Sequence, residues 1–211
     1  MARYTGSVCR LCRAEQRKLF LKGERCYGPK CPITKKRSAP GKNPRGRMKK
    51  MSDYGLQLRE KQRLKRIYGM MEKQFHIFFK KAEKISGKTG DNLITLLERR
   101  LDNIVYRMRF ASSRNMARQL VLHGHVCVNG RKVNIPSFLV KVEDEITINE
   151  KSKKMVVIKE SLKEYTRSGV VPWLEVDPDA MKGFLKGLPI KSDVADLADI
   201  KEQLIVELYS R

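Results

Sequence analysis

The sequence has few acidic residues for its length. Its 211 residues include 23 Asp and Glu against 46 Lys and Arg, a formal net charge of +23. A surface this basic repels itself unless an anionic partner neutralises it, so we expect nucleic acid, an anionic membrane or an acidic protein as partner. Because 41% of the residues are hydrophobic, the composition still favours a folded protein over a disordered chain.

Long apolar runs are absent as well. None approaches the ~20 residues of a membrane span, and the first residues, MARYTGSVCR, have no apolar core of a signal peptide. We therefore expect a cytoplasmic protein with reduced thiols and no membrane partner. The stretch GKTG at residues 87–90 lacks the upstream glycine of a phosphate-binding loop. No small-molecule substrate is expected.

Cysteine occurs five times, and four of the five lie within residues 9–31. The spacing is C-x2-C, thirteen residues, then C-x4-C, formed by Cys9, Cys12, Cys26 and Cys31. Two close pairs predict one tetrahedral Zn²⁺ site that is structural, because four thiolates leave no open position. An iron–sulfur cluster is the main alternative, followed by disulfides or redox thiols. Nearby Arg and Lys residues are expected to lower the thiol pKa values.

The positive charge is concentrated in the first part of the chain. Residues 1–90 hold 26 basic and 6 acidic residues, a net of +20, whereas residues 91–211 hold 20 and 17, a net of +3. The segment KKRSAPGKNPRGRMKK, residues 35–50, has eight basic residues and no acidic one. We interpret it as an arm that becomes ordered on phosphates, with a solvated linker as the alternative.

The residue pattern predicts an α+β protein that is mostly helical at first. Helices are expected over 14–22, as one or two helices after the cap Ser52, over 91–110, and from Ser112 or Ser113 to Leu122. Asn129-Gly130 predicts a hairpin. Strands are expected over 136–142, 144–148 and 155–159, then a core anchor at Trp173 and a helix over 192–211.

These elements predict four regions. A metal knuckle and basic arm occupy residues 1–50, and a helical domain over 51–98 is completed by a C-terminal helix, 190–211. A small RNA-binding domain of two helices and a short antiparallel sheet follows over 99–165. Residues 166–189 form a connector that contains Trp173.

Basic side chains of the small domain are expected to converge on one surface. Arg114 and Arg118 are four residues apart and share one face of a helix. Together with the overall charge, this favours phosphate binding over a merely solvated face. Across the chain the predicted RNA-binding residues are Arg10, Arg13, Lys35, Lys36, Arg37, Arg45, Arg47, Lys49, Lys50, Arg59, Arg63, Arg66, Arg107, Arg114, Arg118, His123, His125, Arg131 and Lys132.

Several stretches resemble the ribosomal protein S4 family in its bacterial form. They are MARYTGSVCRLCR, MSDYGLQLREKQRLKRIYGMMEKQF, GDNLITLLERRLDNIVYRMRF, ASSRNMARQLVLHGHVCVNGRKVNIPSFLV and the ending EQLIVELYSR. The four clustered cysteines resemble the zinc-carrying branch of that family. PGKNPRGR departs from the family, which often has a shorter loop there.

The resemblance implies a non-enzymatic protein of the cytoplasmic ribosome. It would bind small-subunit ribosomal RNA directly, nucleate assembly of the subunit body and contribute to translational accuracy. Expected neighbours are ribosomal protein S5 and messenger RNA near its entry channel. Basic positions of the family are matched by Arg47, Lys49, Lys50, Arg131 and Lys132.

Three rival interpretations stay open. Proteins associated with RNA modification or ribosome rescue also carry such a small domain. A ribosome-associated chaperone or heat-shock RNA binder would share that domain but not the cysteine cluster and the C-terminal tail. About fifty residues follow that domain here, too few for a separate catalytic domain. A zinc-dependent DNA regulator would need a recognition helix, and none is evident.

Overall fold

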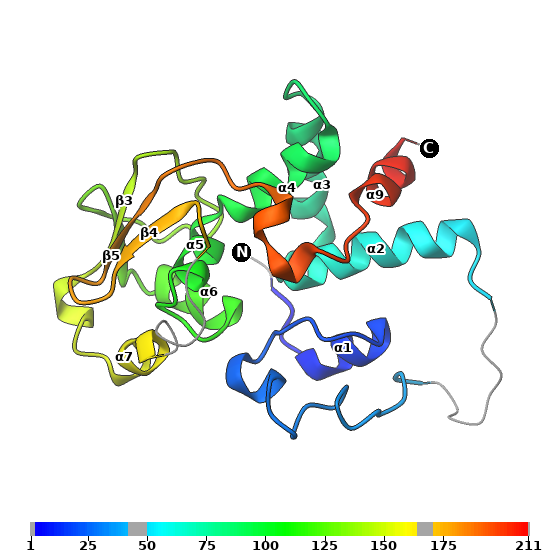
Figure 1. Cartoon of the computed structure of the whole chain (residues 1–211), viewed down its shortest axis with the longest axis horizontal. Helices are drawn as coiled ribbons and strands as arrows, with labels where there is room; N and C mark the ends of the chain where they lie inside the picture. The colour runs from blue at the N-terminus through cyan, green and yellow to red at the C-terminus, as the bar shows by residue number, and fades with distance from the viewer. Residues whose placement is uncertain (1–2, 42–49, 164–170, 211) are drawn as a thin grey trace. The chain divides into compact units, whose positions relative to one another are not determined.

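The chain folds into two compact units that combine helices with one small antiparallel sheet (Figure 1). The computed structural model describes residues 3–41, 50–163 and 171–210. Unit 1 comprises Met1–Leu93 and Asp199–Arg211, and unit 2 comprises Ile94–Ala198. This mixture confirms the predicted α+β class. Within the described ranges, no helix has the length and apolarity needed to cross a membrane.

Unit 1 is helical. Its elements are α1 (Val8–Glu15), the 3-10 turn η1 (Gly23–Cys26), α2 (Asp53–Ile67), α3 (Glu72–Glu83), the start of α4 (Thr89–Glu98) and α9 (Glu202–Tyr209). The Ser52 side chain accepts a hydrogen bond from the Gly55 N–H at 3.2 Å, which confirms the predicted cap of α2. Gly69, with φ at 61°, separates α2 from α3.

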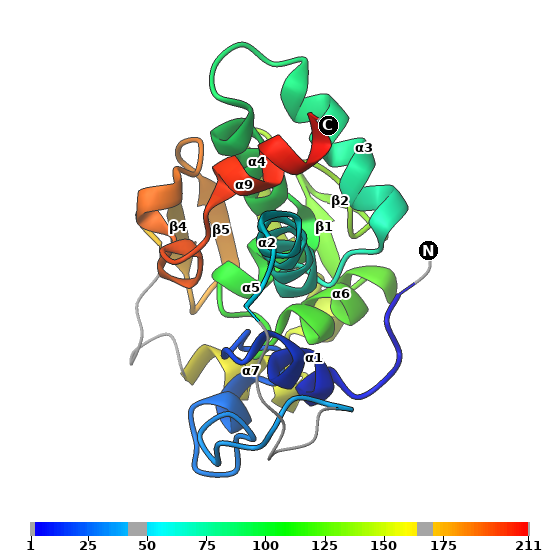
Figure 2. The same ribbon diagram turned by 90° about the vertical axis from the view of Figure 1, so that its right-hand side faces the viewer.

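The C-terminal helix α9 packs against α2 within unit 1 (Figures 1 and 2). Ile205 is fully buried, and the ring of Tyr209 lies 4.4 Å from that of Phe79, centroid to centroid. The Tyr209 hydroxyl donates to Glu72 at 3.0 Å. Burial raises the pKa of Glu72, but hydrogen bonds from two lysines of α2 outweigh it and lower that pKa to about 2.

Unit 2 packs helices against a five-stranded antiparallel sheet in the order β2-β1-β3-β5-β4. The strands are β1 (Val126–Val128), β2 (Arg131–Lys132), β3 (Glu145–Ile148), β4 (Leu174–Asp177) and β5 (Lys182–Leu185). The helices are the end of α4, α5 (Leu101–Arg107), α6 (Arg114–Leu122), α7 (Val156–Lys163) and the 3-10 turns η2 (Glu150–Ser152), η3 (Lys191–Asp193) and η4 (Ala195–Leu197).

In unit 2 the structure confirms the predicted helix cap, the hairpin turn and the buried tryptophan. Ser113 caps α6 by accepting from the Met116 N–H at 3.4 Å. Asn129 and Gly130 both have positive φ, 50° and 74°, as a two-residue turn between β1 and β2 requires. Trp173 is buried in the core beneath the sheet, as expected for an anchor.

Three predicted elements are wrong. The helix near the cysteines spans α1 instead of 14–22, because Gln16 takes a left-handed conformation that ends it. Residues 136–142 form no strand and make only an isolated bridge from Leu139. Residues 155–159 begin α7, where Ile158 is buried while Val156 is exposed, so burial of one helical face prevails over β propensity.

The last part of the chain also differs from expectation. Residues 174–177 and 182–185, expected within a connector, instead supply β4 and β5 to the sheet. The predicted helix over 192–211 is interrupted, since only residues 202–209 form α9 and two 3-10 turns precede it.

Candidate nucleic-acid interface

The four clustered cysteines lie on α1, at the end of η1 and just after it. All are free thiols, and Cys12, Cys26 and Cys31 are buried. The Lys22 N–H donates to the Cys26 sulfur at 3.3 Å. Among the described residues, which include every cysteine, no group of three or more His, Cys, Asp or Glu is placed to hold a metal ion. The Zn²⁺ site and its iron–sulfur alternative stay predictions.

Thiol acidity differs within this group. Burial raises the pKa of Cys12 and of Cys26, and repulsion from the neighbouring thiols raises both further. At Cys31 burial also raises the pKa, but hydrogen bonds from Thr34 and Ile33 outweigh burial, so the pKa is lowered. The expectation that basic neighbours lower every thiol pKa is therefore wrong for Cys12 and Cys26, because burial prevails there.

The basic arm is described only in part. Lys35, Lys36, Arg37 and Lys50 are exposed, whereas Arg45, Arg47 and Lys49 lie outside the described residues. Arg10 on α1 is exposed. Arg13 is half-buried and donates to the Ser38 carbonyl at 3.4 Å, which holds the start of the arm beside α1.

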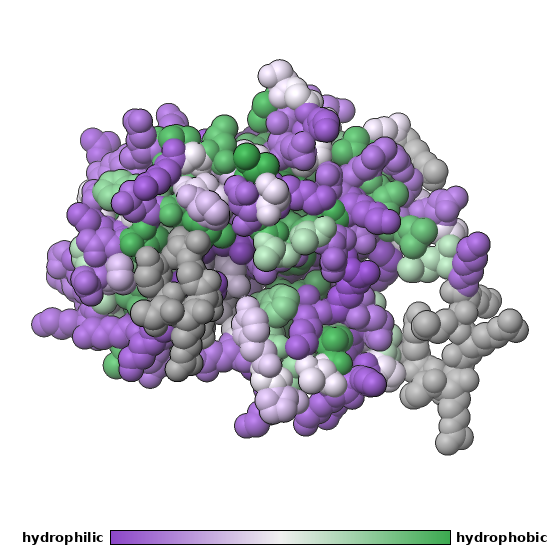
Figure 3. All heavy atoms as spheres, viewed as in Figure 1, coloured by the Kyte–Doolittle hydropathy of each residue, from purple (hydrophilic) through white to green (hydrophobic). Residues whose placement is uncertain are grey.

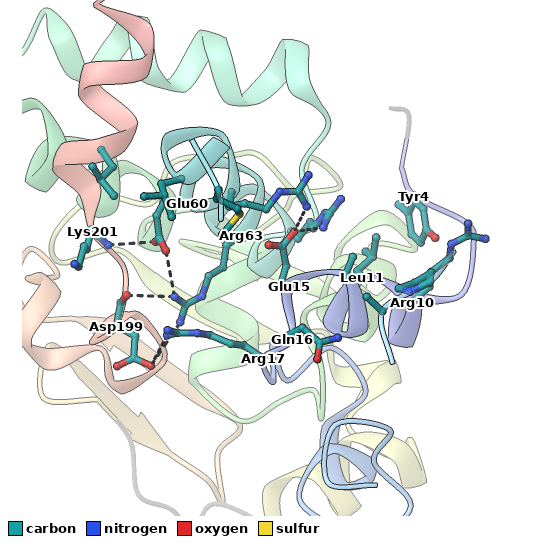
Figure 4. A pocket seen from close by; sticks show the side chains of 18 residues that line it. Tyr4, Arg10, Leu11, Glu15, Gln16, Arg17, Glu60, Arg63, Asp199 and Lys201 are labelled. Atoms are coloured by element: carbon teal, nitrogen blue, oxygen red, sulfur yellow. Dashed lines mark hydrogen bonds and ion pairs between the residues drawn. The ribbon is translucent and has the colours of Figure 1, made fainter. Parts of the chain in front are cut away.

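Unit 1 also contains an open cleft of about 1210 Å³ between α1, α2 and the segment that leads into α9 (Figure 4). Its charged lining is Arg10, Arg17, Arg59, Arg63, Arg66 and Lys201 against Glu15, Glu60 and Asp199. Six cations and three anions leave an excess of three positive charges. Arg17 and Lys201 were not predicted from the sequence, because single basic residues in a basic chain carry no distinguishing signal.

Arginines of α2 mostly hold unit 1 together. Arg59 and Arg66 both pair with the Glu15 carboxylate of α1, whose side chain is 4% exposed. Arg63, itself 8% exposed, pairs with Glu60 at 3.5 Å and with Asp199 at 3.6 Å. Arg59 keeps the largest exposed surface of the three, 41%. Of the α2 arginines predicted to bind RNA, Arg59 therefore presents the most accessible guanidinium.

The arginines predicted on the exposed face of α6 are buried instead. Arg114 pairs with Asp196 at 3.1 Å, and Arg118 pairs with Asp102 at 3.2 Å, each with 8% of its side chain exposed. Arg107 pairs with Asp196 at 3.0 Å. The expectation of an exposed phosphate-binding face is thus wrong for these residues. Buried guanidinium groups need carboxylate partners, and the fold supplies them.

The acidic residues of this network escaped the sequence analysis. Asp102 accepts two hydrogen bonds from the buried Arg100, at 3.0 and 2.6 Å, and the buried Glu98 accepts from Arg107. A signal was available in LERRLDN, where Glu98 and Asp102 interrupt an apolar helical pattern. Asp196 had no such signal, since acidic residues recur every three positions around it, at Asp193, Asp196 and Asp199.

The tip of unit 2 brings together four predicted RNA-binding residues, here called the hairpin cluster: His123, His125, Arg131 and Lys132. His123, Arg131 and Lys132 are exposed, and His125 is half-buried. The two imidazole centroids lie 6.0 Å apart. Among the described residues, no carboxylate pairs with any member of the cluster.

Hydrophilic side chains cover most of the face seen in Figure 3, with hydrophobic residues in smaller patches. The hairpin cluster, the described part of the basic arm and the cleft of unit 1 are the surfaces on which cations gather.

Comparison with known proteins matches the whole length of the chain. Residues 3–98 match the family described as "Ribosomal protein S4/S9 N-terminal domain", and residues 99–146 match "S4 domain". Proteins called "Small ribosomal subunit protein uS4" from Geobacter sp. (strain M21), Geotalea daltonii and Pelobacter propionicus are 55%, 56% and 56% identical. Each alignment covers 211 residues, all of both chains. The chain therefore belongs to the ribosomal protein S4 family.

Proposed function

We propose that this chain is a structural constituent of the small ribosomal subunit and binds ribosomal RNA of that subunit directly. Family membership and the name shared by its relatives support this proposal. The observation that carries it is the hairpin cluster, where the exposed Lys132 lies beside the turn that holds His123 and His125, and Arg131 is exposed next to it on β2. Among the described residues, no carboxylate pairs with any of the four. Such cations neutralise phosphates and release condensed counterions.

The RNA-binding residues proposed here divide into two surfaces. One is the hairpin cluster of unit 2. The other lies on unit 1 and comprises the exposed Arg10, Lys35, Lys36, Arg37, Lys50 and Arg59. Arg45, Arg47 and Lys49, outside the described residues, are proposed as RNA-binding from the sequence, Arg47 and Lys49 by the family resemblance. Buried arginines position these surfaces without touching RNA.

The family resemblance supports finer roles. In this proposal the protein binds the RNA before other proteins do, nucleates assembly of the subunit body and contributes to accuracy. It works in the cytoplasmic ribosome, contacts ribosomal protein S5 near the messenger entry, and catalyses no reaction. Binding to protein-free RNA is what nucleation requires, so the RNA experiment below also tests this role.

We also propose that Cys9, Cys12, Cys26 and Cys31 together hold one Zn²⁺. The donor chemistry fits, since all four thiols are free and the other three lie close enough to Cys12 to raise its pKa, although their positions fall short of a coordinating group. A bound ion would crosslink α1 to η1 and the following loop. Elemental analysis of the purified protein should find about one zinc per chain. Iron with visible cluster absorbance, or no metal at all, would contradict this assignment.

RNA binding is tested with the full-length protein and a protein-free transcript of small-subunit ribosomal RNA, titrated over a range of salt concentrations. Replacing Lys132 with Glu should weaken binding about tenfold and reduce the slope of log affinity against log salt by about one. The matched control is Lys186→Glu, which makes the same charge change just after β5, away from β2 in the strand order.

The control should leave affinity within about twofold of the parent, because a general charge effect is screened beyond the Debye length. Equal losses in the two variants would remove the hairpin cluster from the interface. Failure of the parent protein to bind the transcript even at low salt would overturn the proposed function itself.

A further inference from the structure

We propose that the hairpin cluster is a proton-linked phosphate site, in which His125 gains a proton as an RNA phosphate binds beside Lys132. This inference rests on the proposed function and specifies how one RNA surface is regulated. Neither histidine has an acidic partner among the described residues, so an anion from outside the chain is the counter-charge that the site lacks.

A backbone turn at Gly124 brings His123 and His125 close to the end of the Lys132 side chain. His123 follows the last turn of α6, and Gly124 reverses the chain with φ at 69° before His125 leads into β1. A Cβ at Gly124 would lie 1.9 Å from Cε of Lys132, so only glycine lets the lysine stem pack over this turn. The turn at Gly124 therefore places the two histidines, and the flexible end of the exposed Lys132 side chain reaches over that turn.

Hydrogen bonding orients the second imidazole. Nδ1 of His125 lies 2.8 Å from Oγ of Ser152 on η2, and the His125 carbonyl accepts from the Asn149 N–H at 2.9 Å. With Nδ1 engaged by a hydroxyl, Nε2 is the nitrogen left to meet a ligand. A hydroxyl can accept or donate, so it permits both protonation states of the ring.

The charged groups around His125 are mostly cationic. The end of α6 brings His123, and β2 brings Lys132, with Arg131 as its neighbour on that strand. The 3-10 turn η2 brings Lys151 and Glu150, and Glu150 is paired with Lys153 at 2.6 Å. Burial lowers the pKa of His125, and the charges of His123 and Lys132 lower it further. An anion placed among these groups offsets the repulsion between the neighbouring cations and a protonated His125.

The sign of the linkage follows. A phosphate beside the His125 imidazole raises its pKa in the complex above the value in the free protein. Affinity is then lowest above the bound-state pKa, rises as pH falls through it, and levels off below the free-state pKa. A rise of one-half to one unit limits the total gain in affinity to about three- to tenfold, which is reached only well below the free-state pKa.

The test measures affinity of the full-length protein for the small-subunit RNA transcript at pH 6, 7 and 8 and constant ionic strength. The parent should bind more tightly at pH 6 than at pH 8, by a factor of at most about three to ten. The double variant His123→Gln and His125→Gln should lose that gradient. His76→Gln, which changes the remaining histidine of the chain on α3, should keep it.

Calorimetry of the parent protein in two buffers with different ionisation enthalpies gives a second readout that needs no variant. Net proton uptake on binding at pH 7 is expected. A parent affinity that stays flat from pH 6 to pH 8, a gradient that persists in the double variant, or zero proton uptake would each overturn the proton linkage. Salt-sensitive binding with a flat pH profile would leave the proposed RNA-binding function standing.

Discussion

Replacing Asp102 with Ala is expected to lower the free energy of unfolding by about 3–5 kcal/mol. The Asp102 side chain is 7% exposed and holds two buried arginines, Arg100 at 2.6 Å and Arg118 at 3.2 Å. Removing the carboxylate leaves both guanidinium charges in a poorly hydrated site without their main counter-charge. Chemical denaturation of the full chain, followed by circular dichroism, measures the change.

Two further variants separate charge from packing. Asp102→Asn keeps the side-chain volume and removes the charge, so it should destabilise nearly as much as the alanine variant. Glu150→Ala breaks an ion pair whose carboxylate is 83% exposed and should cost at most about 1 kcal/mol. A loss at Asp102 as small as that at Glu150 would show that the network contributes little to stability.

Replacing Ile205 with Ala is expected to lower the free energy of unfolding by about 2–5 kcal/mol. Ile205 is fully buried where α9 packs against α2, so truncation leaves a cavity in the core of unit 1. Alanine favours helices, and the effect therefore reports lost packing instead of helix propensity. The same denaturation experiment measures it, with protease susceptibility of residues 199–211 as a local readout.

The matched control for this prediction lies on the same helix. Gln203 is exposed on α9, so Gln203→Ala should change stability by less than about 0.5 kcal/mol. If both variants behave alike, α9 does not complete the core of unit 1. The long sequence separation between α9 and α2 makes this contact one that only the folded chain creates.

Local chemistry explains which elements could be predicted. Ser52 and Ser113 cap helices through their own side chains, and Asn129-Gly130 turns the hairpin because both residues tolerate positive φ. Each signal acts within a few residues, so the sequence suffices. The helix α7 was missed for the opposite reason. Its β-branched residues favour a strand locally, and burial of Ile158 against a distant core decides the outcome.

The candidate interface likewise contains residues that local sequence predicts and residues whose role depends on distant partners. His123, His125, Arg131 and Lys132 lie within ten residues around one turn, so sequence proximity predicts a shared surface, and the two imidazole centroids lie 6.0 Å apart. Arg114 was also predicted as an RNA contact, but its partner Asp196 is 82 residues away. A pattern of helical spacing identifies residues on one face without saying whether that face meets water or a carboxylate.

By itself, the sequence determined the family, the α+β class, the cysteine spacing and the concentration of positive charge before residue 91, because these are properties of order and composition. The tertiary structure alone decided which cations remain available to a ligand. The buried Arg63, Arg114 and Arg118 form ion pairs with carboxylates that are distant in sequence, since a desolvated guanidinium requires a partner. Exposed Arg131 and Lys132 have no such requirement, and their charge is left for an external anion.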